Sequence, residues 1–149
     1  MSKWDAAKNA PLTDQEQRDR VLGEVEGFLK VDIQQPVYRG MYLKLNNALV
    51  AAPGPVAAGM VTMMKTLQSE YDEVSLHLTV DLENSLFWTN HALVVVQPKV
   101  FGRPRKQIDP KYREPLLKSS TPLTLRLEKQ GHRWVIATME GTLPEPQSP

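Results

Sequence analysis

The chain has 149 residues, 41% of them hydrophobic and 23% charged, a balance typical of one globular domain large enough to bury a core. It contains no cysteine, which excludes disulfide bridges, thiolate metal ligands and a thiol nucleophile. The formal net charge of +1 conceals an asymmetry, because residues 1–98 carry 8 Lys/Arg against 12 Asp/Glu, whereas residues 99–149 carry 10 against 5.

Residues 1–12 have no apolar core of signal-peptide length, and we expect them to form a flexible arm. A helix is predicted to follow, because Thr13 and Glu16 stand at the spacing of a capping box and apolar residues then recur at helical intervals. Without a leader the expected compartment is the cytoplasm, unless the chain is a domain excised from an extracytoplasmic protein.

The longest stretch without a charge runs from residue 45 to residue 64. Its length would suit a membrane span, but the Pro-Gly-Pro sequence at 53–55 interrupts any helix there, since proline lacks the N–H and restricts the residue before it. We therefore predict two helices that meet at this corner, one over Val37–Ala52 and one over Pro55–Glu70, and no transmembrane span.

The second of these helices carries three methionines, Met60, Met63 and Met64. One interpretation is a buried helical hairpin with the methionines on its core face. The other is a methionine-lined groove for a ligand or a partner helix, because the methionine side chain adapts to irregular surfaces.

After the helices the hydrophobic period changes to two. Residues 74–82 alternate as in a half-buried antiparallel strand, the polar residues 83–85 are typical of a turn, and residues 86–97 are predicted to form a second strand. Four prolines lie between residues 98 and 120, which are expected to form a long irregular loop. The last unit is a hairpin with a two-residue turn at Gln130-Gly131.

This order predicts an α+β fold with three N-terminal helices packed on a curved four-stranded antiparallel sheet. The expected organisation is a single domain over residues 13–141, followed by a flexible tail over residues 142–149. The hairpin turn places Leu127 opposite Trp134 and Leu125 opposite Ile136 on one face of the sheet.

The candidates for catalysis are His77, Asp81, His91 and Tyr42. A three-residue turn puts His77 opposite His91, and a facing pair could bind a metal or exchange protons near neutral pH; the alternative is two partly exposed histidines on a solvated face. Asp81 with Tyr38 or Tyr42 could supply the base and the oxyanion donor of an isomerase, although the tyrosines also fit the core stripe. Spacing places no third ligand, so neither a metal nor a cofactor is predicted.

A basic segment covers residues 99–118, with Phe101 and Tyr112 among its cations. The candidate partner-binding cations are Lys99, Arg103, Arg105, Lys106, Lys111 and Arg113. Three interpretations remain open: a solvated loop, a surface for an acidic protein partner, and a nucleic-acid site that combines phosphate contacts with stacking.

The order of helices before strands, closing on LTLRLEKQGHRWVIATMEG, resembles the cone-shaped nuclear-transport-factor-like superfamily. Members often end in a strand pair with a Trp-x-Ile pattern after a glycine turn, here Trp134-Val135-Ile136. The usual early hairpin between the second and third helices is missing. In this respect the chain is more similar to the periplasmic domains of type IV secretion scaffold proteins, whose membrane anchor is not predicted here.

The superfamily includes isomerases, dehydratases and epoxide hydrolases, and also non-catalytic binding and assembly domains, so the resemblance implies a fold and not a function. Since no catalytic constellation is apparent, the leading hypothesis is a non-catalytic assembly domain with a protein partner or self-association, as in a secretion or conjugation complex. The alternatives are a small-ligand protein or enzyme that uses the concave face of the sheet, and nucleic-acid binding through residues 99–118.

Overall fold

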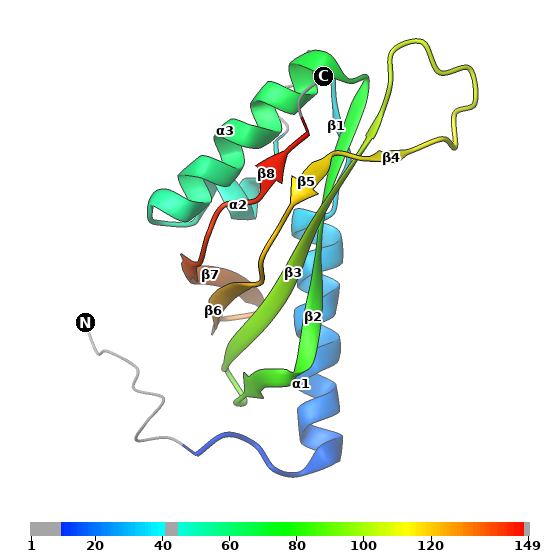
Figure 1. The fold of residues 1–149 in the computed structure, drawn as a ribbon. Coiled ribbons are helices and arrows are strands. Elements are labelled where there is room, and N and C mark those ends of the chain that lie inside the picture. Colours follow the sequence, from blue (N-terminus) through cyan, green and yellow to red (C-terminus); the bar gives the residue numbers. More distant parts are fainter. Residues whose placement is uncertain (1–9, 41–44, 148–149) are drawn as a thin grey trace.

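The computed structural model describes residues 10–40 and 45–147, and these form an α+β fold (Figure 1). The helices are α1 (Gln15–Phe28), which continues into a π-helical turn (Leu29–Ile33), α2 (Asn47–Ala51) and α3 (Pro55–Glu70). The strands are β1 (Val37–Tyr38), β2 (Glu73–Phe87), β3 (His91–Arg103), β4 (Glu114–Pro115), β5 (Leu117–Ser119), β6 (Leu123–Gln130), β7 (Arg133–Glu140) and β8 (Glu145–Pro146).

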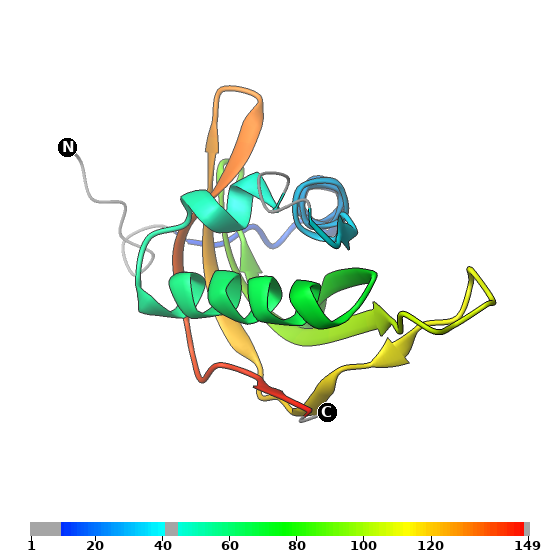
Figure 2. The ribbon, with the colours of Figure 1, turned by 90° about the horizontal axis from the view of Figure 1, so that it is seen from above.

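One curled antiparallel sheet has the strand order β1-β2-β3-β6-β7, and β4 also pairs with β3. The strands β5 and β8 form a separate pair that lies beside α3 in Figure 1. The four predicted strands are present as β2, β3, β6 and β7, but the predicted total of four was wrong because short strands extend the sheet at β1 and β4. Figure 2 shows α1 end-on and α3 lengthwise, so the two helices cross the sheet in different directions.

The Pro-Gly-Pro corner at 53–55 separates two helices, as predicted. Gly54 has φ = 99°, a value that favours glycine, and Pro55 is the first residue of α3. At the other end of the helical region, α1 begins one residue later than the capping box predicts, because Asp14 accepts a hydrogen bond from the Gln17 N–H at 2.9 Å. No helix of the described residues is long and apolar enough to cross a membrane.

The helix predicted over Val37–Ala52 was wrong at its start, and among its described residues only those of α2 are helical. Residues 41–44 of the prediction lie outside the described residues. Val37 and Tyr38 instead form β1 at the edge of the sheet and pair with β2. Gly40 then turns the chain with φ = 82°, and the buried Asn46 side chain ties the start of α2 to the backbone carbonyl of Ile33.

The turn predicted at residues 83–85 was also wrong, because these residues lie inside β2 and the chain reverses at residues 88–90. The physical reason is a buried serine. The Ser85 hydroxyl donates to the Asp81 carbonyl at 2.6 Å and accepts from the Val95 N–H at 3.0 Å, so this polar segment forms a bulge between two strands.

The long loop predicted from residue 98 is shorter, because β3 continues through Pro98 to Arg103. The C-terminal hairpin has its turn at Gly131 and His132, one residue later than predicted, and Leu127 therefore pairs with Ile136 and not with Trp134. A displacement of two residues along a strand keeps every side chain on its face, so the predicted apolar face of the hairpin is preserved.

The face of the sheet under the helices is filled by side chains. One buried cluster joins α1, α2, α3 and all four long strands, and it includes Met60, Met64, Val94, Leu125 and Trp134. The described side chains thus pack much of the concave face, and the concave-face ligand alternative stays a prediction.

The structure gives residues 142–147 of the predicted flexible tail defined positions. Glu145–Pro146 pairs with β5, Pro144 is buried, and Leu143 lies against Gly59 of α3. A Cβ added to Gly59 would stand 2.5 Å from the Leu143 Cδ1 atom, so Leu143 occupies the space that the glycine leaves on α3. The C-terminal segment therefore covers one side of this helix.

Candidate functional site

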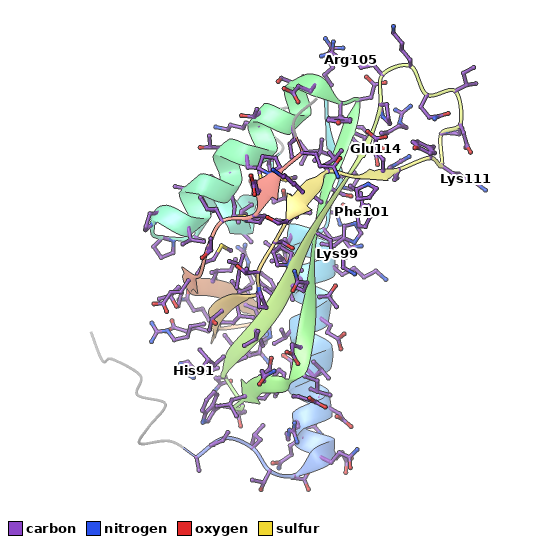
Figure 3. The ribbon with its side chains drawn as sticks, viewed as in Figure 1. His91, Lys99, Phe101, Arg105, Lys111 and Glu114 are labelled. Carbon is purple, nitrogen blue, oxygen red and sulfur yellow. The ribbon has the colours of Figure 1, made fainter. Side chains whose placement is uncertain are left out.

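His77 lies on the face of the sheet away from the helices, where it pairs with Lys99 and its ring contacts Phe101. Figure 3 labels Lys99 and Phe101 on β3. Its Nε2 atom is 3.1 Å from the Ser75 hydroxyl, and its ring meets the Phe101 ring edge to face at 5.1 Å. Burial lowers the pKa of His77, and the Lys99 ammonium group lowers it further. No carboxylate of the described residues bonds to the ring, so Ser75 and His77 lack the acid that orients a catalytic histidine.

The facing pair of His77 and His91 predicted from the sequence was wrong. His91 pairs with Glu128 of β6, and Lys99 follows His91 by eight positions on β3, which corresponds to roughly 26 Å of strand. Figure 3 shows His91 at one end of β3 and Lys99 well along the same strand. Burial lowers the pKa of His91, the Glu128 carboxylate raises it, and Arg126 lowers it.

The other catalytic candidates do not converge on a site. Asp81 accepts a hydrogen bond from the Asn84 amide at 2.7 Å, and it lies four residues from His77 along β2, or roughly 13 Å. Tyr38 is an exposed residue of β1, and Tyr42 lies outside the described residues. The described part of the chain contains no group of three or more His, Asp or Glu residues placed to hold a metal ion.

The three methionines of α3 separate into two environments. Met60 and Met64 have no exposed surface and belong to the core, so they cannot line a groove for a partner. Met63 is half-buried and borders a hollow of about 400 Å³ between α3 and the C-terminal segment at Leu143. The interpretation of the methionines as core residues therefore holds for Met60 and Met64.

Two of the six candidate cations are bound within the molecule. Arg113 forms a bidentate pair with Glu73, in which Nε donates to Oε1 at 3.0 Å and Nη2 donates to Oε2 at 2.8 Å. Its Nη1 atom also donates to the Pro110 carbonyl at 2.6 Å. Arg105 donates to the Ser69 carbonyl in the last turn of α3. These two arginines therefore hold both ends of residues 104–113, which we term the basic loop.

The other four cations divide between strand and loop. Lys99 and Arg103 belong to β3. Lys106 and Lys111 are exposed in the basic loop, and neither side chain forms an ion pair with a described residue. Figures 1 and 2 both show the basic loop projecting beyond the sheet, and Figure 3 places Arg105 and Lys111 on its two arms.

Short-range hydrogen bonds organise the basic loop. The Asp109 carboxylate accepts from the Lys111 N–H at 2.9 Å, and the Asp109 carbonyl accepts from the Tyr112 N–H at 3.1 Å. The Gln107 side chain accepts from the Asp109 N–H at 3.2 Å. Asp109 thus closes a turn of the kind that aspartate before proline favours.

This turn presents apolar groups to solvent at the end of the loop. The Ile108 residue is 95% exposed, and Tyr112 is 42% exposed. Sequence reasoning named Tyr112 among the cations but missed Ile108. The available signal was one large aliphatic residue between Lys106 and Lys111 in an otherwise polar segment.

The base of the basic loop has a hollow of about 480 Å³ against the end of α3. Tyr71 and Glu114 line it together with Arg105 and Lys106. Burial raises the pKa of the Tyr71 hydroxyl, and the Glu114 carboxylate, which accepts a hydrogen bond from that hydroxyl, raises it further. The neutral Tyr71 hydroxyl and the Glu114 carboxylate therefore line this hollow next to Arg105 and Lys106.

No protein-family model, curated protein or solved structure matches this chain. The resemblance to the cone-shaped superfamily accordingly stays a prediction, and function must be argued from the geometry alone.

Proposed function

We propose that this chain is a non-catalytic interaction domain of the cone type, which takes its place in a larger assembly by docking the basic loop on an acidic protein surface. The observation that carries the proposal is Ile108, a large apolar residue held almost fully in solvent at the end of a loop that is organised by its own hydrogen bonds.

Each part of the loop fits protein docking. An exposed aliphatic side chain gains binding energy when it enters an apolar pocket of a partner, because its surface leaves water. The cations Lys106 and Lys111 flank it, and they would steer association toward a surface of opposite charge. The Arg113–Glu73 pair and the Asp109 turn restrict the conformational freedom of the basic loop before binding. This reduces the conformational entropy that the loop loses on association.

The geometry favours a protein over a nucleic acid. Stacking on bases needs an open aromatic face, and the Phe101 ring already contacts His77 on the sheet. Arg113, which could have contacted a phosphate, is engaged by Glu73. Only Tyr112 of the two aromatic residues is exposed beside the loop lysines.

Photo-crosslinking tests the proposal. The photoreactive residue p-benzoyl-L-phenylalanine is placed at Ile108, and at Val31 as a control position that is also exposed, at 62%. Both proteins are irradiated in an extract of the source organism. We expect one protein crosslinked from position 108 and not from position 31. A crosslink to nucleic acid alone, or none specific to position 108, contradicts the proposal.

The captured protein is then purified and its affinity measured. Lys106→Glu with Lys111→Glu should weaken binding at least about tenfold, because both charges then repel an acidic surface. The matched control, Lys30→Glu with Lys65→Glu, makes the same charge change at two other exposed positions and should alter the affinity less than about threefold. Equal losses of affinity in the two double variants would show that binding depends only on net charge. That result would contradict docking through the basic loop.

A further inference from the structure

A cleft lies between the end of α1, helix α2 and the hairpin β6–β7, away from the basic loop. It consists of a hollow of about 330 Å³ and an adjoining hollow of about 260 Å³. The two share Phe28, Asp32, Arg133 and Trp134, so they adjoin each other, and we term them together the cleft. In Figure 2 the hairpin β6–β7 and the basic loop project in different directions, which makes the cleft a separate surface.

The floor of the cleft is aromatic and firmly held. Phe28 and Trp134 are each 7% exposed and belong to the core. Glu24 accepts a hydrogen bond from the Trp134 Nε1 atom at 3.2 Å and from the Lys129 Nζ atom at 2.7 Å. The indole is therefore fixed, and the charge of Glu24 is balanced by Lys129.

Two charged side chains that line the cleft have no protein partner among the described residues. Asp32 comes from the π-helical turn after α1, and Arg133 is the first residue of β7. Both are exposed and border both hollows, and neither side chain forms an ion pair or hydrogen bond with a residue that the structure describes. The lining of the cleft thus offers a carboxylate and a guanidinium group, neither engaged within the described residues, beside two aromatic residues.

We infer that this cleft binds a small zwitterion with an apolar side chain, of the size and chemistry of a free α-amino acid. The ligand carboxylate would pair with the Arg133 guanidinium group and the ligand ammonium group with Asp32, while its side chain would cover Phe28 and Trp134. The volume is at the lower end of the range for small-molecule sites, which suits a compact ligand. A ligand that carries one charge would leave either Asp32 or Arg133 without an ion partner.

Four related probes test the inference: L-leucine, L-phenylalanine, N-acetyl-L-leucine, which lacks the ammonium group, and L-leucinamide, which lacks the carboxylate. Binding to the full chain is measured by NMR chemical-shift titration, with the Trp134 indole resonance as reporter. We expect both zwitterions to saturate and to shift that resonance, and each single-charge analogue to bind at least about tenfold more weakly. Binding of all four with equal affinity, or of none at 50 mM, overturns the inference.

Variants assign the binding to the cleft. Asp32→Asn and Arg133→Gln should each weaken L-leucine binding at least about tenfold, and both positions are exposed, so the fold should persist. Asp19→Asn and Arg39→Gln make the same changes at exposed positions outside the cleft and should leave the affinity within about twofold. Unchanged affinity in both cleft variants overturns the inference, and thermal unfolding by circular dichroism verifies that each variant is folded. Loop variants that lose the protein partner should still bind L-leucine, so the two proposals fail separately.

Discussion

At the residue scale, the charged side chains that matter most for stability connect elements far apart in the sequence. Glu24 on α1 reaches Lys129 and Trp134 on the hairpin β6–β7, and Glu73 on β2 reaches Arg113 at the end of the basic loop. By contrast, Lys118 and Glu145 form a largely exposed pair at 3.7 Å, and such pairs contribute little.

We predict that Glu24→Gln lowers the free energy of unfolding by about 0.5–1 kcal/mol at pH 7, a small effect because the pair is partly exposed. The hydrogen bond from Lys129, opposed by burial, lowers the pKa of Glu24 from its ordinary value of 4.5. The stabilisation is therefore complete above pH 4.5 and disappears as the pH falls through the lowered pKa. Urea titrations of the wild type and of Glu24→Gln at several pH values measure this difference in the free energy of unfolding.

The control for this variant is Glu26→Gln, which removes a carboxylate from an exposed position of the same helix. It should change the unfolding free energy by less than about 0.5 kcal/mol at any of these pH values. A difference between wild type and Glu24→Gln that persists at acidic pH would show that the contact with Lys129 is not the cause.

We predict that His77 titrates below its ordinary pKa of 6.5, because burial disfavours its charged form and Lys99 adds repulsion. Its contribution to stability is therefore complete above pH 6.5 and is lost as the pH falls through the lowered pKa. Lys99→Gln should raise the pKa of His77, because it removes the repulsion by Lys99 and leaves the effect of burial unchanged. NMR titration of the His77 ring protons measures both values, and a pKa at or above 6.5 in the wild type would contradict the prediction.

At the element scale, the basic loop depends on the contact between Arg113 and Glu73. We predict that Arg113→Lys, which cannot form the bidentate pair, increases amide hydrogen exchange over residues 104–113 and leaves β6 and β7 unchanged. Lys118→Ala, which removes the exposed pair with Glu145, should leave the exchange of the loop unchanged. Unaltered loop exchange in Arg113→Lys would mean that the Asp109 turn and the Arg105 contact organise the loop without the bidentate pair.

Elements with a continuous periodic pattern were predictable from the sequence. Helix α3 has the predicted bounds because Pro55 starts it and a helical stripe runs to its end. The alternation over residues 74–82 marks β2, and the apolar face of the hairpin β6–β7 is the predicted one. In each case the local pattern and the tertiary environment favour the same structure.

The failures arose where a polar residue serves a tertiary contact. Ser85 lies in a polar triplet typical of a turn, yet its buried hydroxyl bridges β2 and β3. The resulting change of register separated His77 from His91 and removed the predicted pair. Val37, which was predicted to begin a helix, instead lies in the edge strand β1. Such contacts join residues distant in the sequence, so no local pattern contains them.

The candidate site was predictable only as a charged segment. Composition located the cations of residues 99–118, but which of them are engaged depends on Glu73 and Ser69, which lie more than thirty residues away. The cleft between α1 and the hairpin was not predictable, because Asp32 and Arg133 are a hundred residues apart in the sequence. They line the same cleft because α1 packs against the hairpin β6–β7, which it contacts through Glu24.

At the scale of the whole molecule, a single core connects the helices to the sheet. The buried cluster extends from Val21 in α1 to Met139 in β7 without a division into two parts. The unfolding of such a core should be one cooperative transition. The single domain over residues 13–141 stays a prediction, and the cleft shares Phe28 and Trp134 with this core.

The methionines of α3 provide the test of this core. We predict that Met64→Ala lowers the free energy of unfolding by about 2–5 kcal/mol, because it leaves a cavity at a fully buried position. Met63→Ala, one residue earlier and half-buried, should cost less than about 1 kcal/mol. Urea titrations followed by tryptophan fluorescence and by circular dichroism measure both values, and the two probes should give coincident transitions. Similar losses in the two variants would place Met63 in the core, and separate transitions would show that helices and sheet unfold independently.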